Sequence, residues 1–398
     1  MKVLILHQHF KTPQNGGALR SYYLAKALVE RGVKTLVITA HNAKEYRTEF
    51  IEGIEVIYLP VPYDNRFGFY KRIYAFIQFV LKAVKYAARH KDADLCYAIS
   101  VPLTTGAAAV WIQHRYKIPF IFEVGDLWPD APIQMGFIRN RLLQRGLYQL
   151  ESVVYNTAKS IVALSPAIRD VIHKKAPGKT VHLLPNMADT DFFKPEEKRL
   201  ALVEKFNVKG KFIVAYIGAI GVANGLDYFL ECAGASQQAG LPIHFLMCGE
   251  GAMLDKLKQS AKDLSLQNFT FLPFQNREGV GEILNVTDAT FICYQPVSIL
   301  ETGSPNKYFD GLAAGKLTLI NFGGWIRDEV EQERCGIYID PKHPEDFVEK
   351  IKPFLDDRAL LKKYQQAGRL LAEKKYSRRM LGEEFCGIIG GSKKLRQQ

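Results

Sequence analysis

The sequence predicts two doubly wound α/β domains that are arranged in tandem and face each other across a cleft. The 398 residues exceed the length of one typical domain, which is roughly 100–200 residues. Apolar residues make up 47% of the chain, enough to fill large cores. Short runs rich in β-branched and aromatic residues alternate with helical stretches, a pattern typical of βαβ units with parallel sheets.

The first half of the chain contains the elements of one such domain. Its start, Met1 to His7, reads as a buried strand, because an apolar stretch this short does not resemble a signal peptide. Helices are expected between the strands, at 17–32, 71–90 and 103–117 among others. The expected strands are 2–7, 34–39, 54–59, 94–98, 119–124, 160–164 and 180–184.

A second series of elements begins after about residue 210. Between the two series lies a polar stretch that contains proline, from Pro185 to Lys211, so we expect a first domain at 1–186 and a linker at 187–210. The expected helices are 225–239, 252–264, 278–285, 305–314 and 344–356. The expected strands are 212–217, 243–248, 269–272, 289–293, 317–320 and 336–339.

The charge is distributed unevenly between the two halves. Residues 1–190 hold 25 Lys and Arg against 14 Asp and Glu, whereas residues 191–398 hold 28 against 27. The first half therefore suits an anionic surface or a large anionic substrate. The six cysteines are scattered without C-x-x-C spacing, which disfavours zinc ribbons and thioredoxin chemistry. No apolar run reaches the roughly 18 residues that a membrane span requires, and we expect none.

Glycine-rich turns follow several predicted strands. Gly16 and Gly17 lie between the first strand and a helix, where backbone amides can approach an anion, although an ordinary turn has the same appearance. Their spacing is not the dinucleotide pattern, which disfavours NAD. In the second domain, two more turns point to a nucleotide site, and the residues of interest there are Gly218, Gly221, Asn224, Gly249 and Glu250.

The stretch from Glu301 to Lys316 is the most informative. Ser304, Pro305 and Asn306 mark a helix start, and Lys307 lies in the first turn, where a cation opposes the helix dipole. An anion bound beside Lys307 would explain that placement. Asp310 is three residues further along the same face. A lysine for phosphate and an aspartate for hydroxyl groups indicate a sugar-nucleotide site, and a solvated surface pair is the alternative.

Two further segments stand out in the first half. Glu123 and Asp126 follow an apolar strand near Trp128, where a carboxylate could orient a hydroxyl or act as a base; capping and turn formation would explain them equally well. Residues 66–91 carry seven Lys and Arg and no acid, interleaved with aromatic residues. Such a helix suits an anionic lipid surface, although a merely solvated basic face remains open. We assign membrane or acceptor contacts to Arg66, Lys71, Arg72 and Lys82.

Together these segments resemble the family 4 glycosyltransferases of the GT-B fold, over nearly the whole chain. The stretches 122–130 and 303–325 are most similar to the subgroup that builds bacterial O-antigen and capsule repeats, including N-acetyl-fucosamine transferases. Tyr376-Ser377-Arg378 resembles the C-terminal crossover of the family. The resemblance thus implies a second domain at 211–375 and a helix at 376–398 that packs back on the first domain.

The resemblance also implies a retaining, metal-independent transferase that uses a nucleotide-sugar donor and no cofactor. Asp310 matches the second acidic position of the family's E-x7-E motif, which binds ribose hydroxyls, whereas Thr302 occupies the first. The usual basic pair after the first strand of the second domain is replaced by Ala219 and Asn224. We expect Lys307 to supply the positive charge that the missing basic pair would provide. Asp126 lies about where many relatives carry a histidine.

The function expected from these features is transfer of a hexosamine-type sugar from a UDP donor. The acceptor is expected to be linked to a polyprenyl diphosphate, with the protein peripheral at the cytoplasmic face of the plasma membrane and not bound to nucleic acid. Asp126, Glu123 and Lys307 are the expected catalytic residues. The alternatives are a UDP-sugar epimerase of similar fold and a non-enzymatic basic protein that binds membranes or polyanions.

Overall fold

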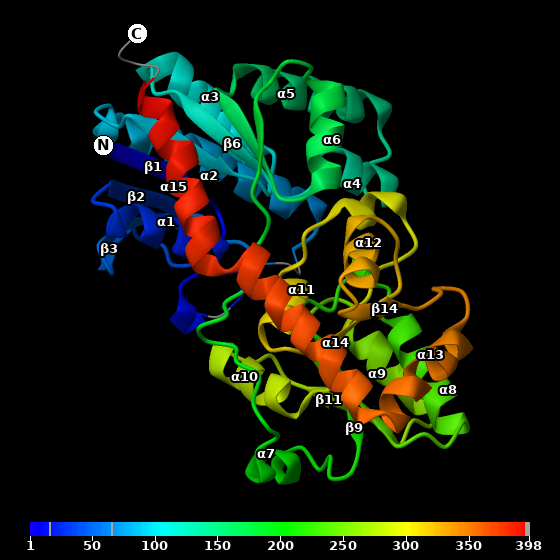
Figure 1. Cartoon of the computed structure of the whole chain (residues 1–398). Coiled ribbons are helices and arrows are strands. Elements are labelled where there is room, and N and C mark those ends of the chain that lie inside the picture. Colours follow the sequence, from blue (N-terminus) through cyan, green and yellow to red (C-terminus); the bar gives the residue numbers. More distant parts are fainter. Residues whose placement is uncertain (16, 65–66, 395–398) are drawn as a thin grey trace.

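The protein consists of two α/β domains, each built around a mainly parallel sheet (Figure 1). The computed structural model describes residues 1–15, 17–64 and 67–394. The predicted fold class, two tandem Rossmann-like domains, is confirmed. Each sheet is buried on both faces, which explains why its strands are nearly continuous apolar runs rather than alternating ones.

The first domain contains an eight-stranded sheet with the order β3-β4-β2-β1-β5-β6-β7-β8. All pairs are parallel except β3 with β4. The strands are β1 (Lys2–Leu6), β2 (Lys34–His41), β3 (Arg47–Ile51), β4 (Ile54–Pro60), β5 (Leu95–Ile99), β6 (Phe120–Val124), β7 (Ser160–Ala163) and β8 (Val181–Leu183). Seven of these match the predicted strands within two residues at either end.

Strand β3 is the one that the sequence analysis missed. It forms a two-residue hairpin with β4, in which Glu52 and Gly53 both have positive φ, at 49° and 83°. This geometry matches the twist of paired strands, and glycine adopts it readily. The strand lies at the sheet edge with Phe50 exposed, so it lacks the apolar run that marks the other strands.

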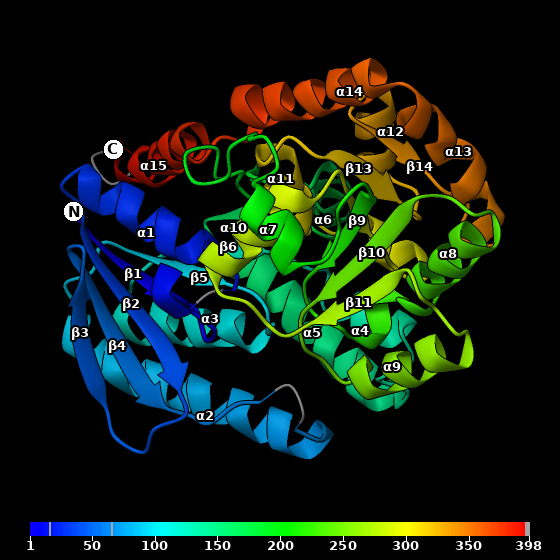
Figure 2. The same ribbon diagram turned by 90° about the horizontal axis from the view of Figure 1, so that it is seen from below.

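Helices cover both faces of the first sheet. In Figure 2 the sheet lies between α1 and α15 on one side and α2 and α3 on the other. The helices of this half are α1 (Arg20–Glu30), α2 (Phe69–Ala87), α3 (Thr104–Tyr116), α4 (Asp130–Gln134), α5 (Arg141–Thr157) and α6 (Pro166–Lys175). Helix α15 (Arg378–Lys394) comes from the far end of the chain and packs against α1.

The second domain contains a six-stranded parallel sheet with the order β11-β10-β9-β12-β13-β14. Its strands are β9 (Phe212–Ile217), β10 (Ile243–Cys248), β11 (Phe269–Leu272), β12 (Ala289–Ile292), β13 (Leu317–Ile320) and β14 (Gly336–Tyr338). Its helices are α7 (Leu200–Lys205), α8 (Asp227–Gln238), α9 (Leu254–Asp263), α10 (Arg277–Val286), α11 (Asn306–Ala313), α12 (Trp325–Gln332), α13 (Pro344–Asp356) and α14 (Arg358–Leu371).

In each sheet the strand order reverses direction at one point, between β1 and β5 and between β9 and β12. Ligands in such folds bind outside the carboxyl ends of the strands at this switch point. In the second domain, the turn after β9 and the start of α11 lie there. The topology therefore places Gly218, Lys307 and Asp310 at the position where a ligand is expected.

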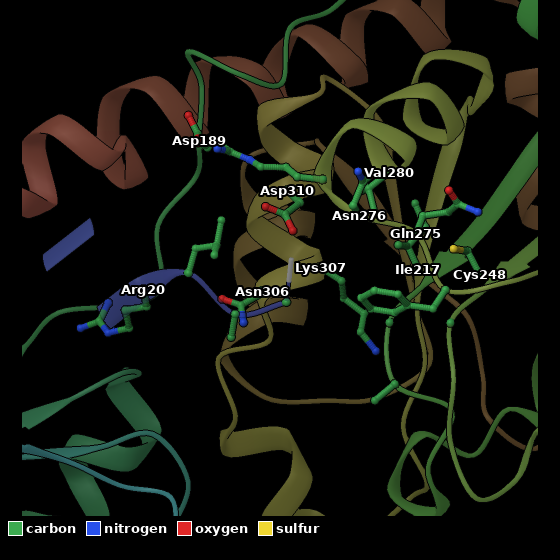
Figure 3. Close-up of a pocket in the computed structure, with 18 of the residues that line it drawn as sticks. Arg20, Asp189, Ile217, Cys248, Gln275, Asn276, Val280, Asn306, Lys307 and Asp310 are labelled. Carbon is green, nitrogen blue, oxygen red and sulfur yellow. Dashed lines mark ion pairs between the residues drawn. The ribbon is translucent and has the colours of Figure 1, made fainter. Parts of the chain in front are cut away.

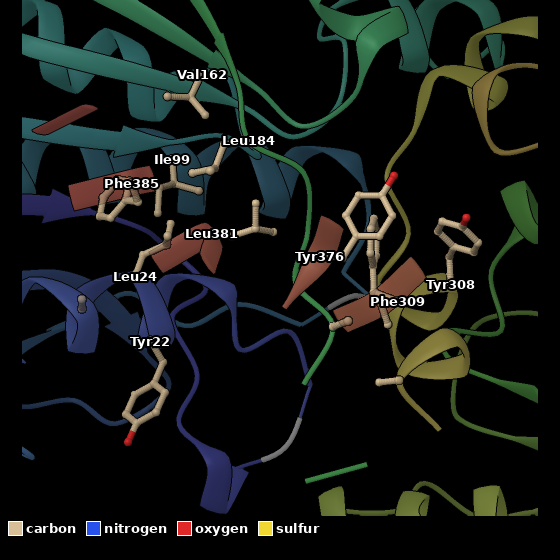
Figure 4. Close-up of a cluster of buried hydrophobic side chains, with 14 of the residues drawn as sticks. Tyr22, Leu24, Ile99, Val162, Leu184, Tyr308, Phe309, Tyr376, Leu381 and Phe385 are labelled. Atoms are coloured by element: carbon tan, nitrogen blue, oxygen red, sulfur yellow. The ribbon is translucent and has the colours of Figure 1, made fainter. Parts of the chain in front are cut away.

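The chain crosses between the domains twice, first between β8 and α7 (residues 184–199) and again between α14 and α15 (residues 372–377), and the two crossings run side by side. The backbone of Ala188 in the first crossing bonds to the second through Ala188 N to Tyr376 O at 2.8 Å and Arg378 N to Ala188 O at 3.1 Å. A single apolar core extends through this region, from Leu24 and Phe385 in the first domain to Phe309 in the second (Figure 4). The two domains therefore share packed side chains rather than a bare linker.

A buried carboxylate joins the second crossing to the second domain. Glu329 on α12 accepts hydrogen bonds from the hydroxyl groups of Tyr308, at 2.6 Å, and Tyr376, also at 2.6 Å, and it pairs with Lys375. Tyr308 follows Lys307 on α11, so this cluster anchors the helix that carries Lys307 into the cleft.

We expect Tyr376→Phe to lower the free energy of unfolding by about 1.5–3 kcal/mol, the value typical of a hydrogen bond to a charged group. The midpoint of urea unfolding measures this. Tyr364→Phe is the matched control, because the Tyr364 ring packs on Phe354 elsewhere in the same domain. Equal midpoints for the two variants would contradict a role for the Glu329 cluster.

Candidate active site

A cavity of about 700 Å³ lies between the two domains at the carboxyl ends of their strands (Figure 3). The first domain contributes the loop from Gly17 to Arg20, and the first crossing contributes Met187 and Asp189. The second domain contributes the glycine turns, the start of α10 and the first turn of α11. The cavity therefore brings together residues from Gly17 to Arg378, which are 361 positions apart in the sequence. Most of the residues predicted to bind the nucleotide sugar or to act in catalysis lie in its wall.

The two glycine turns of the second domain pack backbone against backbone. A Cβ atom on Gly249, where φ is 151°, would lie 1.9 Å from the carbonyl oxygen of Gly218. The amide of Gly218 donates to Cys248 O at 3.0 Å, and the amide of Ile220 donates to Glu250 O at 2.8 Å. Only glycine permits this approach, so the two turns form one surface. Gly218, Gly249, Glu250 and Asn224 line the cavity.

Lys307 reaches from the start of α11 to a position beneath Gly218. Its Nζ donates to the Tyr216 hydroxyl at 2.8 Å and lies 4.1 Å from the centre of that ring. Within residues 1–15, 17–64 and 67–394, no carboxylate lies at ion-pair distance from it. Burial lowers the pKa of Lys307 to about 7. A bound anion would restore the charge of this ammonium group.

Asp310 lies one helical turn beyond Lys307 on the cavity side of α11. Burial raises the pKa of its carboxyl to about 7, against the opposing effect of the nearby charge of Arg277. Figure 3 shows Asp310 and Lys307 on the same wall with Asn306 at the start of the helix. The predicted arrangement of a lysine and an aspartate in one site is therefore present in the structure.

Arg277 is a cavity residue that the sequence analysis missed. It is the first residue of α10, which is capped by the Asn276 side chain accepting from the amide of Gly279 at 2.9 Å. Its guanidinium group pairs with Asp189 and stacks on Phe192 at 4.0 Å. The available signal was its place immediately after a loop that follows a strand, where switch-point ligands bind. No recognised motif surrounds this arginine in the sequence.

The structure gives Glu123 a different place from the predicted catalytic one. It is 1% exposed and pairs with the buried Arg20, whose Nε donates to Oε1 at 3.0 Å and whose Nη2 donates to Oε2 at 2.9 Å. Tyr97 also donates to it, and Arg20 donates to the carbonyl oxygens of Leu184 and Pro185. Because this carboxylate is buried and bonded to Arg20 and Tyr97, it is not exposed to a substrate in the cavity.

Asp126 lies two residues beyond β6 and is exposed. Asp126 does not line the cavity, but Tyr294 does. Burial raises the pKa of Tyr294, and the nearby negative charge of Asp126 raises it further. Asp126 thus remains a candidate for contact with an acceptor that enters from the first domain.

Ser304 and Pro305 do not line the cavity. Ser304 is buried and accepts hydrogen bonds from the backbone and side-chain amides of Asn186 in the first crossing. Pro305 precedes α11 and accepts from the amide of Tyr308 at 3.0 Å. Gly221 is also outside the wall; its amide donates to Asn224 Oδ1 at 3.3 Å and so shapes the turn. Gly17 lines the cavity with φ at 87°, whereas Gly16 and Arg66 lie outside the described residues.

The predicted basic helix corresponds to α2, and its exposed face differs from the expected one. Lys71 and Arg72 are exposed, but Lys82 turns inward and donates to the carbonyl oxygen of Pro60. Aromatic and aliphatic side chains form an outward stripe at helical spacing. This apolar stripe consists of Tyr70, Tyr74, Ile77 and Leu81, each at least half exposed.

The described residues contain neither a metal-binding cluster nor a helix that could span a membrane. Among residues 1–15, 17–64 and 67–394, no group of three or more His, Cys, Asp or Glu side chains is placed to bind a metal ion. Over the same ranges, no helix combines the length and apolar character that crossing a bilayer requires.

Two doubly wound domains around a cation-lined cleft define the GT-B class of nucleotide-sugar enzymes. The chain matches the models of two families, the glycosyl transferase 4-like domain at residues 15–187 and the glycosyl transferases group 1 at residues 199–371. It therefore belongs to the glycosyltransferases of the GT-B fold. The predicted enzyme class is confirmed at this level.

Individual relatives are distant. The alpha-D-kanosaminyltransferase of Streptomyces kanamyceticus is 22% identical over 239 residues, which are 58% of this chain and 60% of that protein. Sucrose-phosphate synthase from Thermosynechococcus elongatus has a similar structure, with a TM-score of 0.80, 13% identity and 98% of each chain covered. Anabaena Alr3699/HepE in complex with UDP-glucose has a TM-score of 0.71, 15% identity, and 98% of this chain and 100% of that chain covered.

We expect the affinity of the cleft for a diphosphate to fall as the pH rises through 7. Lys307 loses its positive charge and Asp310 gains a negative charge in the same range, so both changes make the cleft less positive. The dissociation constant of UDP, measured by calorimetry, should rise at least about tenfold between pH 6.5 and 8.5, since one coupled proton permits up to tenfold per unit.

Lys307→Arg provides the control, because arginine keeps its charge throughout this range. The comparison also cancels the titration of the UDP phosphate itself. The variant should retain only the weaker pH dependence that comes from Asp310. An equal slope in the wild type and the variant would show that Lys307 does not titrate near 7.

Proposed function

We propose that the protein is a retaining glycosyltransferase that moves an N-acetylated hexosamine from a UDP-sugar to a glycan on a polyprenyl diphosphate. The product would be an intermediate of a bacterial surface polysaccharide such as O-antigen or capsule. The observation that carries the proposal is Lys307, a cation without a carboxylate partner in the described chain, held beneath the joined glycine turns. A departing diphosphate needs such a charge.

The geometry of the cleft supports a sugar nucleotide as the donor. Lys307 and the glycine backbone form one wall, suited to phosphate oxygens, and Asp310 is placed one turn away for hydroxyl groups. Structures of HepE hold UDP or UDP-glucose, which supports the choice of uridine for the nucleotide. The hexosamine type is proposed from the sequence resemblance to transferases of N-acetyl-fucosamine.

The proposed reaction is a substitution on one face of the donor sugar. The bond between the sugar C1 and the β-phosphate oxygen breaks, and the acceptor hydroxyl oxygen bonds to C1 from the same side. The hydroxyl proton passes to the departing phosphate oxygen, so no group on the protein is consumed. Lys307 neutralises the charge that develops on the diphosphate, and electrostatic stabilisation of this kind usually dominates catalysis. Asp126 is the candidate that orients the acceptor.

The apolar stripe of α2 supports contact with a membrane surface. Its side chains point away from the core, into which Phe79 and Ala83 of the same helix are packed. Lys71, Arg72, Lys85 and Arg89 flank the stripe. Each basic residue near an anionic bilayer contributes about 1 kcal/mol, and the aromatic residues suit the headgroup region. We therefore propose peripheral attachment to the cytoplasmic face of the plasma membrane.

An assay with UDP-sugars and a polyprenyl-diphosphate glycan tests the function. Mass spectrometry should show a lipid extended by one hexosamine unit and a stoichiometric amount of UDP. Conversion of the UDP-sugar without extension of the lipid would favour an epimerase instead. Neither reaction, together with salt-sensitive binding to polyanions, would favour a non-enzymatic protein.

We expect Lys307→Ala to lower kcat/KM at least about 100-fold, the usual cost of losing one preorganised group that stabilises developing charge. UDP binding should weaken as well, while the melting temperature stays close to that of the wild type because the ammonium group has no ion-pair partner in the described chain. Lys362→Ala on the exposed face of α14 is the control. Unchanged turnover would remove Lys307 from the mechanism.

We expect the double substitution Tyr74→Ser and Leu81→Ser to weaken binding to vesicles that contain anionic phospholipid about tenfold. Both substitutions remove apolar surface that would be buried in the bilayer, and neither changes the net charge. Leu264→Ser with Leu370→Ser, both half exposed on the second domain, is the matched control. Co-sedimentation provides the measurement, and equal binding of the two double variants would contradict the proposed membrane face.

A further inference from the structure

Asp189 in the first crossing is shared between three partners from different parts of the chain. It is 6% exposed, and its Oδ2 accepts from the Tyr23 hydroxyl of α1 and from Nη1 of Arg378 on α15, both at 3.1 Å. Arg277 of α10 pairs with the same oxygen. Its Oδ1 accepts from the amide of Phe192 at 3.2 Å. One buried carboxylate therefore meets two guanidinium groups.

This sharing makes Arg277 exchangeable. If Arg277 moves away, Asp189 keeps the charge of Arg378 and the hydroxyl group of Tyr23, so no buried carboxylate is left without a counter-charge. The pair of Arg20 and Glu123 differs, because Arg20 is the only cation at ion-pair distance from Glu123 among the described residues. Breaking a buried pair of that kind is costly because it strands a charge.

Arg277 also lies where an anionic ligand would compete for it. It lines the same cavity as Lys307, and its charge acts on Asp310. In Figure 3, Asp310 lies between Asp189 on one side and Lys307 on the other. Because Arg277 pairs with Asp189, its guanidinium group lies near Asp189 in the wall of the cavity that Lys307 also lines. Arginine binds phosphate oxygens through two parallel hydrogen bonds, which makes it a strong competitor group.

We propose that Arg277 is a second ligand of the donor diphosphate and that it leaves Asp189 when the donor binds. This inference rests on the proposed function, since the diphosphate is that of the UDP-sugar. Asp189 belongs to the segment that joins the two domains. Donor binding therefore exchanges a contact of that segment for a contact with the ligand, and the occupancy of the cleft is coupled to the crossing.

Calorimetry with UDP and with uridine tests the phosphate contact. Arg277→Gln should weaken UDP binding about tenfold and leave uridine binding within twofold, because uridine carries no phosphate. Arg277→Lys, which keeps the charge but not the paired hydrogen bonds, should lie in between. Arg358→Gln on the exposed surface of α14 makes the same change in charge and should have no effect. Equal UDP affinity of the wild type and Arg277→Gln overturns the proposal.

Asp189→Asn tests the exchange, because it removes the group that competes with the ligand. In the wild-type background it should tighten UDP binding severalfold, and in the Arg277→Gln background it should not. A residue with a merely structural role would weaken binding in both backgrounds, and that result overturns the exchange. Urea midpoints of all variants verify that each is folded.

The outcomes separate this inference from the proposed function. If the wild type binds UDP and Arg277→Gln binds it equally well, the inference is overturned and the proposed function is not. A wild-type protein that binds neither UDP nor a UDP-sugar at millimolar concentration overturns the proposed donor and the inference with it.

Discussion

The parallel pairing of the two interdomain crossings is the constraint on which the rest of the molecule depends. Ala188 bonds to the backbone on both sides of Ser377, so the two segments behave as one short ribbon. The Glu329 cluster ties this ribbon to α11 and α12, and Arg20 ties it to Glu123 at the end of β6. Both domains are therefore anchored to the same pair of segments.

Within that frame, the cleft concentrates charge that the protein does not neutralise by itself. Lys307 has a cation–π contact and a hydroxyl partner but no carboxylate partner in the described chain, and burial lowers its pKa. Asp310 shows the mirror effect, since burial favours its protonated form. Burial disfavours the charged form of both groups. The proposed donor, which carries two phosphates and free hydroxyl groups, would bind both.

Local sequence patterns were sufficient for most of the fold and for part of the site. The strands were recognisable because they are buried on both faces; β3 was not, because an edge strand exposes Phe50 and carries charge. Gly218 and Gly249 were recognisable from the sequence, because the close contact of their backbones requires glycine and so produces glycine-rich turns. The sequence does not show the contacts of other residues, because each has a partner distant in sequence. These residues are Glu123, Ser304, Lys82 and Arg277. Motif spacing cannot reveal such partners.

The position of α15 has a consequence for how this chain can be recombined. By sequence it follows the second domain, yet Leu381 and Phe385 belong to the core of the first, beside Leu24 and Tyr97. A hybrid made by joining two homologous chains at a single breakpoint between the sheets would pair α1 with a foreign terminal helix. Exchange of donor specificity between relatives thus requires two junctions, one at each crossing, so that the first half keeps its own last helix.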